Sequence, residues 1–235
     1  MFEETDTVKT AVTGDALRIG AFNTRVNGEI AVDDAVLHDA ARAAAYDVIV
    51  DLNADERSVP PAYFSAPDHA LLILGAVKRS LTQLIHDAGI KVKCHVVGMN
   101  ALPLFIENQR WEISFGRNAD KEPFKKWAQE MKTDFLEVRD RVGMITPRVV
   151  CMIINEACYT LQEGTATKED IDKGMKLGTN YPYGPFDWCD RIGIKEVYET
   201  LEAIWNDTHD PRYKICPLLK TKYLKGESFY QSSAG

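Results

Sequence analysis

The chain has 235 residues, of which 45% are apolar and 27% charged, so it has enough material for a sizeable buried core. Its 10 prolines and 15 glycines form no tracts, which excludes the disordered and fibrous classes. A net charge of −7 argues against a broad surface for nucleic acid or for an anionic membrane.

The N-terminus and the cysteines indicate a cellular compartment. The first ten residues have neither a basic n-region nor an apolar h-region, and the longest apolar run, residues 70–77, is far shorter than the roughly 20 residues that span a bilayer. The five cysteines are widely spaced and contain no Cys-x-x-Cys pair, so we interpret them as reduced thiols without a metal. We expect a soluble, cytoplasmic protein.

The first half alternates short apolar runs with helical or loop segments, which predicts a parallel α/β sheet. Buried strands are predicted at residues 8–13, 46–52, 70–76 and 94–99, with further strands at 111–115 and 135–138. Helices are predicted at residues 33–45, 80–88 and 122–132.

After residue 142 the apolar period changes from two to about 3.6, which predicts helices. Thr146 is the predicted N-cap of the first, with Pro147 in its first turn and Gly164 after its end. Thr167 and Asp170 resemble a capping box that opens a second helix, ending at Gly178, and two more helices are predicted at 185–192 and 195–206. The change of pattern predicts two domains, 1–142 and 143–235.

Residues 163–190 resemble the signature of the C-terminal domain of the 3-hydroxyacyl-CoA dehydrogenases. The stretch combines two caps, a Tyr-Pro-x-Gly-Pro-Phe turn at 181–186 and a following acid, Asp190; Asp-Pro-Arg-Tyr at 210–213, Pro-Leu-Leu at 217–219 and Phe229-Tyr230 come later. The family's Gly-Lys-x-Thr-Gly-x-Gly before the final Phe-Tyr is shortened here to Lys-Gly-Glu-Ser at 225–228. The resemblance implies a homodimer formed through this domain and an acyl-CoA ligand over which it closes.

The same family places a Rossmann domain first, so the resemblance implies a shortened Rossmann-like parallel sheet followed by an all-helical domain. The first strand of a Rossmann domain feeds a Gly-x-Gly-x-x-Gly turn that lets the backbone reach a diphosphate. Only Gly14 remains of that pattern, because Ala16 and Ile19 replace the other glycines, and Asp15 adds a negative charge. Gly14 is therefore the one candidate cofactor-binding residue, and we expect no cofactor; NAD is expected only if the activity is retained.

A Rossmann domain also ends its second strand, about 20 residues after the turn, with an acid for the adenosine ribose. No strand is evident over residues 24–29, and the strand at 46–52 resembles the family's fourth strand. We therefore predict that a strand, helix and strand are missing, and that Asp33 and Asp39 are solvated surface carboxylates.

The family oxidises a 3-hydroxyl with a histidine as general base, oriented by a glutamate twelve residues later. Asn100 stands at the histidine position, after Gly-Met at 98–99, and Glu112 lies twelve residues beyond it. An amide has no basic nitrogen, so Asn100 could donate a hydrogen bond to Glu112 but could not accept the proton. Glu112 has either a binding role or a structural role, and we favour the structural one.

The histidines of the sequence do not replace the missing base, and two substrate-binding positions of the family are also changed. His95 lies five residues upstream on the same strand, roughly 16 Å away at about 3.3 Å per residue, and the remaining histidines, interpreted as ordinary surface or packing residues, are His38, His69, His86 and His209. The family's substrate-binding serine falls near Gly75, with no hydroxyl until Ser80, and its asparagine is Pro147.

Three hypotheses follow from these residues. The first, which we favour, is a catalytically impaired family member with an acyl-CoA-binding or protein-interaction role. The second is an active NAD-dependent 3-hydroxyacyl-CoA dehydrogenase with a rebuilt site. The third is a structural subunit that pairs with a full-length dehydrogenase or with itself.

Overall fold

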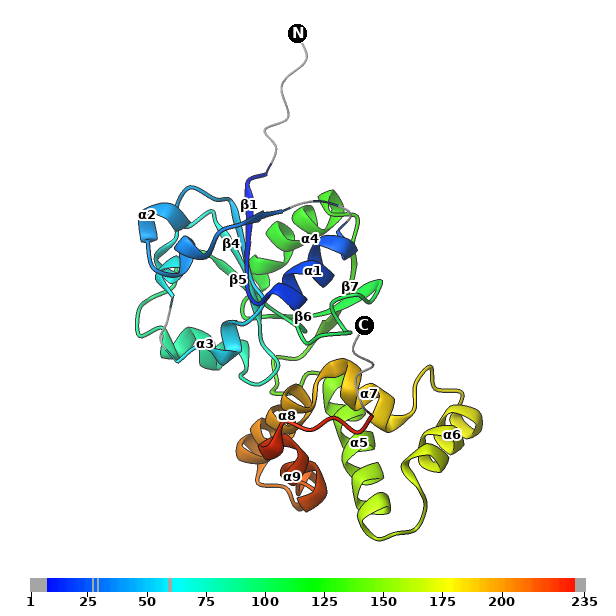
Figure 1. Cartoon of the computed structure of the whole chain (residues 1–235). Helices are drawn as coiled ribbons and strands as arrows, with labels where there is room; N and C mark the ends of the chain where they lie inside the picture. Colours follow the sequence, from blue (N-terminus) through cyan, green and yellow to red (C-terminus); the bar gives the residue numbers. More distant parts are fainter. Residues whose placement is uncertain (1–7, 27, 29, 59–60, 231–235) are drawn as a thin grey trace. The chain divides into compact units, whose positions relative to one another are not determined.

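The computed structural model describes residues 8–26, 28, 30–58 and 61–230, and Figure 1 shows its course. The chain divides into two units, Met1–Arg141 and Val142–Gly235, each of which packs chiefly within itself. The first unit contains a sheet flanked by helices, and the described part of the second is helical.

The sheet of the first unit is mostly parallel, with the strand order β2-β1-β3-β4-β5-β6-β7. Its strands are β1 (Thr10–Thr13), β2 (Ala31–Val32), β3 (Val48–Asp51), β4 (Leu71–Gly75), β5 (His95–Met99), β6 (Arg110–Phe115) and β7 (Asp134–Val138). The strands from β1 to β5 are parallel, β6 is antiparallel to β5, and β7 is parallel to β6. Six of these strands confirm the sequence prediction, and β2 was not predicted.

Helices cover both faces of the sheet, which is why β1, β3 and β4 are buried along their whole length. Figure 1 shows α1 (Ala16–Arg25) and α4 (Lys121–Glu130) on one side of the strands and α3 (Leu81–Asp87) on the other. An aromatic cluster fills the core beside α1 and α4: the ring centroid of Phe22 lies 5.6 Å from that of Trp111 and 6.5 Å from that of Trp127.

The predicted continuous helix over residues 33–45 is wrong. The segment contains a short 3-10 helix, η1 (Asp34–Leu37), and a single helical turn, α2 (Ala40–Ala43). The side chain of Asp33 accepts a hydrogen bond from the backbone of Ala35, and Asp39 accepts from the backbone of Ala41 and Arg42. Each aspartate therefore caps a new turn, and the cap at Asp39 separates α2 from η1.

Three further 3-10 helices lie in the first unit: η2 (Ala54–Glu56), η3 (Ala62–Ser65) and η4 (Asn118–Asp120). The second unit contains α5 (Thr146–Gln162), α6 (Lys168–Thr179), α7 (Pro185–Ile192), α8 (Ile194–Thr208), η5 (Pro211–Tyr213) and α9 (Pro217–Lys225). The first four helices confirm the prediction, and α9 was not predicted.

The helix ends are partly as predicted. Thr167 caps α6 through its side chain, which accepts from the Asp170 N–H, and Pro147 lies in the first turn of α5. The prediction of Thr146 as an N-cap is wrong, because α5 already includes it and Ile145 precedes the helix without a side-chain cap. The five cysteines are free, as predicted, and all five are buried. In the part of the chain that the structure describes, no helix is both long enough and apolar enough to cross a membrane.

Candidate functional site

The turn between β1 and α1 is closed by a carboxylate of the chain itself. Asp15 is the N-cap of α1, and its Oδ1 accepts a hydrogen bond from the Arg18 N–H at 2.9 Å. Its Oδ2 accepts from the Arg18 guanidinium at 2.7 Å and from Asn53 Nδ2 at 3.1 Å. A helix N-terminus attracts an anion through its free N–H groups and its dipole, and here that anion is a side chain.

The charge on Asp15 is stabilised by this arrangement. Partial burial acts to raise the pKa of Asp15, but the hydrogen bonds from the Arg18 backbone and from Asn53, together with the Arg18 charge, outweigh it and lower that pKa below its ordinary value. The turn therefore carries a carboxylate that is ionised at neutral pH.

The surviving glycine of the turn packs against the neighbouring strand. Gly14 has a φ of 152°, and a Cβ at this position would lie 2.9 Å from Asn53 Oδ1 and 3.1 Å from Leu52 Cβ. Only glycine fits without a shift of these neighbours. The residues that approach Gly14 closely, Leu52 and Asn53, belong to the segment after β3. Gly14 therefore has a structural role.

A short second strand is present, which corrects the prediction that it is missing. β2 pairs with β1 in parallel, and Asp33 follows it directly, at the place where a Rossmann domain has its ribose-binding acid. Asp33 is 8% exposed, so its predicted surface location is wrong, whereas Asp39 is exposed as predicted.

The carboxylate of Asp33 is engaged within the chain. Its Oδ2 accepts hydrogen bonds from the Tyr46 hydroxyl at 2.7 Å and from the Arg42 guanidinium. The Tyr46 hydrogen bond, with that of Arg42, lowers the pKa of Asp33. β2 is an edge strand of the described sheet. A Rossmann domain has a further strand beyond this position, which would continue the adenosine site, and the described sheet does not contain that strand.

The two candidate catalytic positions lie opposite each other. Asn100 follows β5, Glu112 lies on the antiparallel strand β6, and the Asn100 N–H donates to the Glu112 carbonyl at 3.0 Å. Their exposed fractions are 3% and 7%. The structure thus brings together the positions of the family's histidine and glutamate, and Asn100 still lacks a basic nitrogen. A side-chain hydrogen bond between them stays a prediction.

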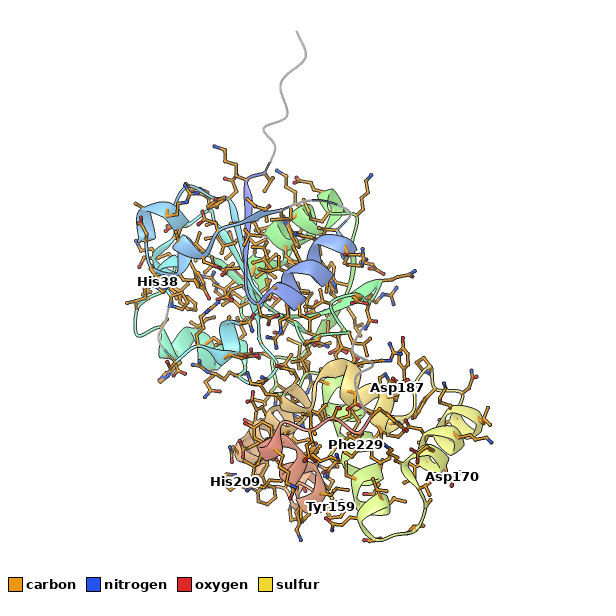
Figure 2. All side chains as sticks on the ribbon, in the orientation of Figure 1. His38, Tyr159, Asp170, Asp187, His209 and Phe229 are labelled. Carbon is orange, nitrogen blue, oxygen red and sulfur yellow. The ribbon has the colours of Figure 1, made fainter. Side chains whose placement is uncertain are left out.

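The histidines do not supply a base beside Asn100. His95 begins β5, at the opposite end from Asn100, and its Nδ1 lies 3.1 Å from Asp120 Oδ1. The other four histidines are exposed. Two of them, His38 and His209, are labelled in Figure 2, one in each unit.

The remaining family positions also have structural roles. The Ser80 hydroxyl caps α3 by accepting from the Gln83 N–H at 3.1 Å. A Cβ at Gly75 would lie 2.6 Å from the Leu52 carbonyl oxygen, so this position is fixed by close packing. Pro147 lies inside the first turn of α5 and offers no donor.

Two buried acids, one at the end of β3 and one shortly after it, were missed in the sequence. Asp51 is completely buried and accepts from the Arg57 guanidinium at 2.8 Å and from the Tyr63 hydroxyl at 2.9 Å. Asp55 accepts from the backbone N–H groups following β4, and burial raises its pKa to about 6. Their place at the carboxyl end of a buried strand was the available signal, because polar residues at the carboxyl ends of parallel strands line the ligand crevice of such sheets.

In the second unit the family signature is explained by packing. Asp172 on α6 caps α7, accepting from the Phe186 N–H at 2.8 Å and the Asp187 N–H at 3.1 Å. A Cβ at Gly184 would lie 2.2 Å from Asp172 Cγ, so glycine is required there. These residues join α6 to α7.

The last two residues that the structure describes, Phe229 and Tyr230, are bound by the last acid of the signature. The Asp190 carboxylate accepts from the Phe229 N–H at 2.9 Å and the Tyr230 N–H at 2.7 Å. The Phe229 ring, labelled in Figure 2, lies 4.5 Å from the Phe186 ring. The shortened 225–228 segment therefore still allows the final Phe-Tyr pair to bind α7.

A groove of about 390 Å³ runs between α5, α6 and α7. It is lined largely by apolar side chains, with acidic and hydroxyl groups among them: Ile153, Glu156, Ala157, Thr160, Asp170, Ile171, Met175 and Pro185. A groove of this character suits an apolar partner surface.

The residues of the first unit do not fit a dinucleotide. Asp15 takes the N–H group of α1 that a phosphate would bind, Gly14 is packed against the chain, and the carboxylate of Asp33 already has two partners. At both the diphosphate position and the ribose position, the groups that would bind the ligand are bonded within the protein.

A family model described as 3-hydroxyacyl-CoA dehydrogenase, C-terminal domain, matches residues 143–235. The 3-hydroxyadipyl-CoA dehydrogenase of Escherichia coli is 41% identical over 106 residues, which cover 45% of this chain and 22% of that protein. Residues 143–235 therefore form a 3-hydroxyacyl-CoA dehydrogenase C-terminal domain. The 3-hydroxybutyryl-CoA dehydrogenase of Clostridioides difficile is 26% identical over 184 residues, or 74% of this chain and 64% of that protein.

The chain spans less than two thirds of the length of these two curated relatives. Its fold matches the solved structure of Mycobacterium tuberculosis FadB2 with a TM-score of 0.76 and 16% identity, over 96% of this chain and 99% of that one. The likeness establishes a Rossmann-like domain followed by a helical one.

Proposed function

We propose that this chain is a catalytically impaired 3-hydroxyacyl-CoA dehydrogenase whose role is binding, of an acyl-CoA and of a second copy of itself. The observation that carries the proposal is the Asp15 carboxylate at the N-terminus of α1. Two negative groups, a carboxylate and a diphosphate, would repel each other at one helix end. Without a dinucleotide there is no hydride acceptor for the oxidation.

The substitution at the position of the general base supports the same proposal independently. Asn100 faces Glu112 in a buried pair of strands, and an amide cannot take a proton from a substrate hydroxyl at neutral pH. Loss of a general base alone costs roughly 10²–10⁴-fold in rate. The first defect removes the hydride acceptor and the second removes the proton acceptor, so repairing one leaves the other in place.

A turnover assay tests the impairment. The full chain is mixed with NADH and acetoacetyl-CoA, and NADH absorbance is followed against a buffer blank and against an active NAD-dependent dehydrogenase. We expect no oxidation above the blank. Turnover that scales with the amount of this chain would overturn the proposal.

Binding of a second copy is supported by the apolar groove and by exposed apolar side chains on the helices that form it. Val149 on α5 is 54% exposed and Leu177 on α6 is 77% exposed. Sedimentation velocity at micromolar concentration tests the dimer. We expect Ile153→Glu, within the groove, to shift the chain to a monomer, and Leu224→Glu, an exposed α9 residue that does not line the groove, to leave it dimeric. A wild-type monomer contradicts the dimer.

The retained Glu112 favours one alternative, an active dehydrogenase with a rebuilt site. Its buried carboxyl group keeps the family position opposite residue 100. This alternative requires NADH to bind and turn over, so the assay above separates the two.

A further inference from the structure

Arg18 is a buried cation in the first unit. It lies in the first turn of α1, and its side chain is 3% exposed. An arginine is rarely buried to this extent unless its charge is paired and its donors are used, because removing a guanidinium from water is costly. The hydrogen-bond partners of Arg18 therefore show which segments of the chain its buried charge connects.

The guanidinium joins segments that follow three different parallel strands. Nη1 donates to Asp15 Oδ2 at 2.7 Å, Nη2 to Glu56 Oε1 at 2.8 Å, and Nε to the Ala101 carbonyl at 2.9 Å. Asp15 follows β1, Glu56 follows β3, and Ala101 follows β5.

Lys78 extends these contacts to β4, the strand between β3 and β5. It follows β4, its side chain is 8% exposed, and its Nζ donates to Glu56 Oε1 at 3.0 Å. We call Asp15, Arg18, Glu56 and Lys78 the Arg18 network. Together with the Ala101 carbonyl, it connects the carboxyl ends of β1, β3, β4 and β5.

In a Rossmann sheet the dinucleotide lies across these same strand ends, with its diphosphate at the first helix N-terminus. A ligand bound there stabilises the folded state and orders the loops that contact it. We propose that the Arg18 network replaces the dinucleotide in this chain and orders the carboxyl edge of the sheet without any ligand. The inference rests on the proposed function, because it requires a chain that does not bind NAD.

Hydrogen–deuterium exchange of the full chain tests the replacement. Arg18→Met removes the charge and the donors while keeping an apolar stem. We expect amide exchange to become at least about tenfold faster at residues 14–18, 53–56 and 101–102, since these segments lose their common contact. Exchange equal to that of the wild type in all three segments would overturn the inference.

Arg25→Met is the matched control. Arg25 lies on the same helix and donates to the Asn108 and Gln109 carbonyls, away from the network. We expect this variant to change exchange near residues 108–109 and to leave 53–56 as in the wild type. Faster exchange at 53–56 in Arg25→Met would contradict a specific role of Arg18.

Glu56→Gln is a milder variant for the case that Arg18→Met does not fold. It leaves the contacts of Arg18 to Asp15 and Ala101, so we expect faster exchange confined to residues 53–56 and 78. Wild-type protection there would count against the network. A wild-type sample with NADH separates the proposed function from the role of the Arg18 network. Slower exchange at residues 14–18 on addition of NADH would defeat the proposed function. Unchanged exchange in the variants would defeat only the role of the network.

Discussion

At the scale of single residues, Asn100 pairs through its backbone with Glu112 but lacks the basic nitrogen of a histidine. Asn100→His would return a group that titrates near neutral pH opposite Glu112. We still expect no NADH oxidation with acetoacetyl-CoA, because Asp15 continues to close the turn after β1. Measurable turnover by this variant would mean that the missing base was the only defect.

Gly14 is predicted to be essential for packing, in contrast to Gly20 on α1. Gly14→Ala introduces a Cβ against Asn53 and Leu52, so we expect the free energy of unfolding to fall by about 1–3 kcal/mol. A methyl group added at Gly20 would meet open space, and Gly20→Ala should raise the free energy of unfolding by up to about 1 kcal/mol. Urea denaturation measures both, and a neutral Gly14→Ala would contradict the packing role.

Asp55 predicts a pH dependence of stability. Burial raises its pKa in the folded chain to about 6, whereas an unfolded chain has a value near 3.9. Between these pH values the folded state holds more protons, so the free energy of unfolding falls as pH rises from about 4 to about 6, by roughly 3 kcal/mol for this group.

Asp55→Asn should remove that contribution. The amide oxygen can still accept from the Val77 and Lys78 N–H groups and carries no charge. We expect the variant to be more resistant to urea than the wild type at pH 7.5, with the difference vanishing near pH 4. An equal pH profile for the two proteins would show that Asp55 does not titrate as stated.

At the scale of elements, the signature acids connect helices. Asp190→Ala leaves the Phe229 and Tyr230 N–H groups without their acceptor, and we expect a loss of about 1–3 kcal/mol of stability in urea. Asp187→Ala, on the same helix, removes only a partly exposed pair with Arg191 and should change stability by less than about 1 kcal/mol. Equal effects of the two variants would contradict the role of Asp190.

Most elements could be predicted because they have a clear apolar pattern. β3, β4 and β5 are runs of buried, mostly β-branched and aliphatic residues, and α5, α7 and α8 each have a buried apolar face. β2 is only two residues long and both residues are exposed, so it shows no apolar period. α9 mixes lysines with leucines and buries only Leu219, so it has no apolar stripe to detect.

The candidate site could be predicted only where it depends on short-range spacing. The positions of Asn100 and Glu112 follow from two neighbouring strands, so the family spacing located them. The partners of Arg18 lie 38 and 83 residues further along the chain, at Glu56 and Ala101. Contacts at such separations depend on the sheet order, which no local pattern contains, and the Arg18 network was therefore missed.

At the scale of the whole molecule, the two units have diverged to different degrees from the family pattern. The second retains the signature acids and glycines and their contacts. In the first, the sheet is retained, but its ligand edge is occupied by ion pairs of the protein. Under the proposed function, the fold has been kept while the groups for hydride and proton transfer have been replaced.

Isothermal titration of NADH into the full chain tests this account most directly, with an NAD-dependent dehydrogenase as the positive control. We predict no saturable heat at concentrations that saturate the control, because the positions of the diphosphate and ribose are filled by Asp15 and by the partners of Asp33. Saturable binding in the low micromolar range would contradict it.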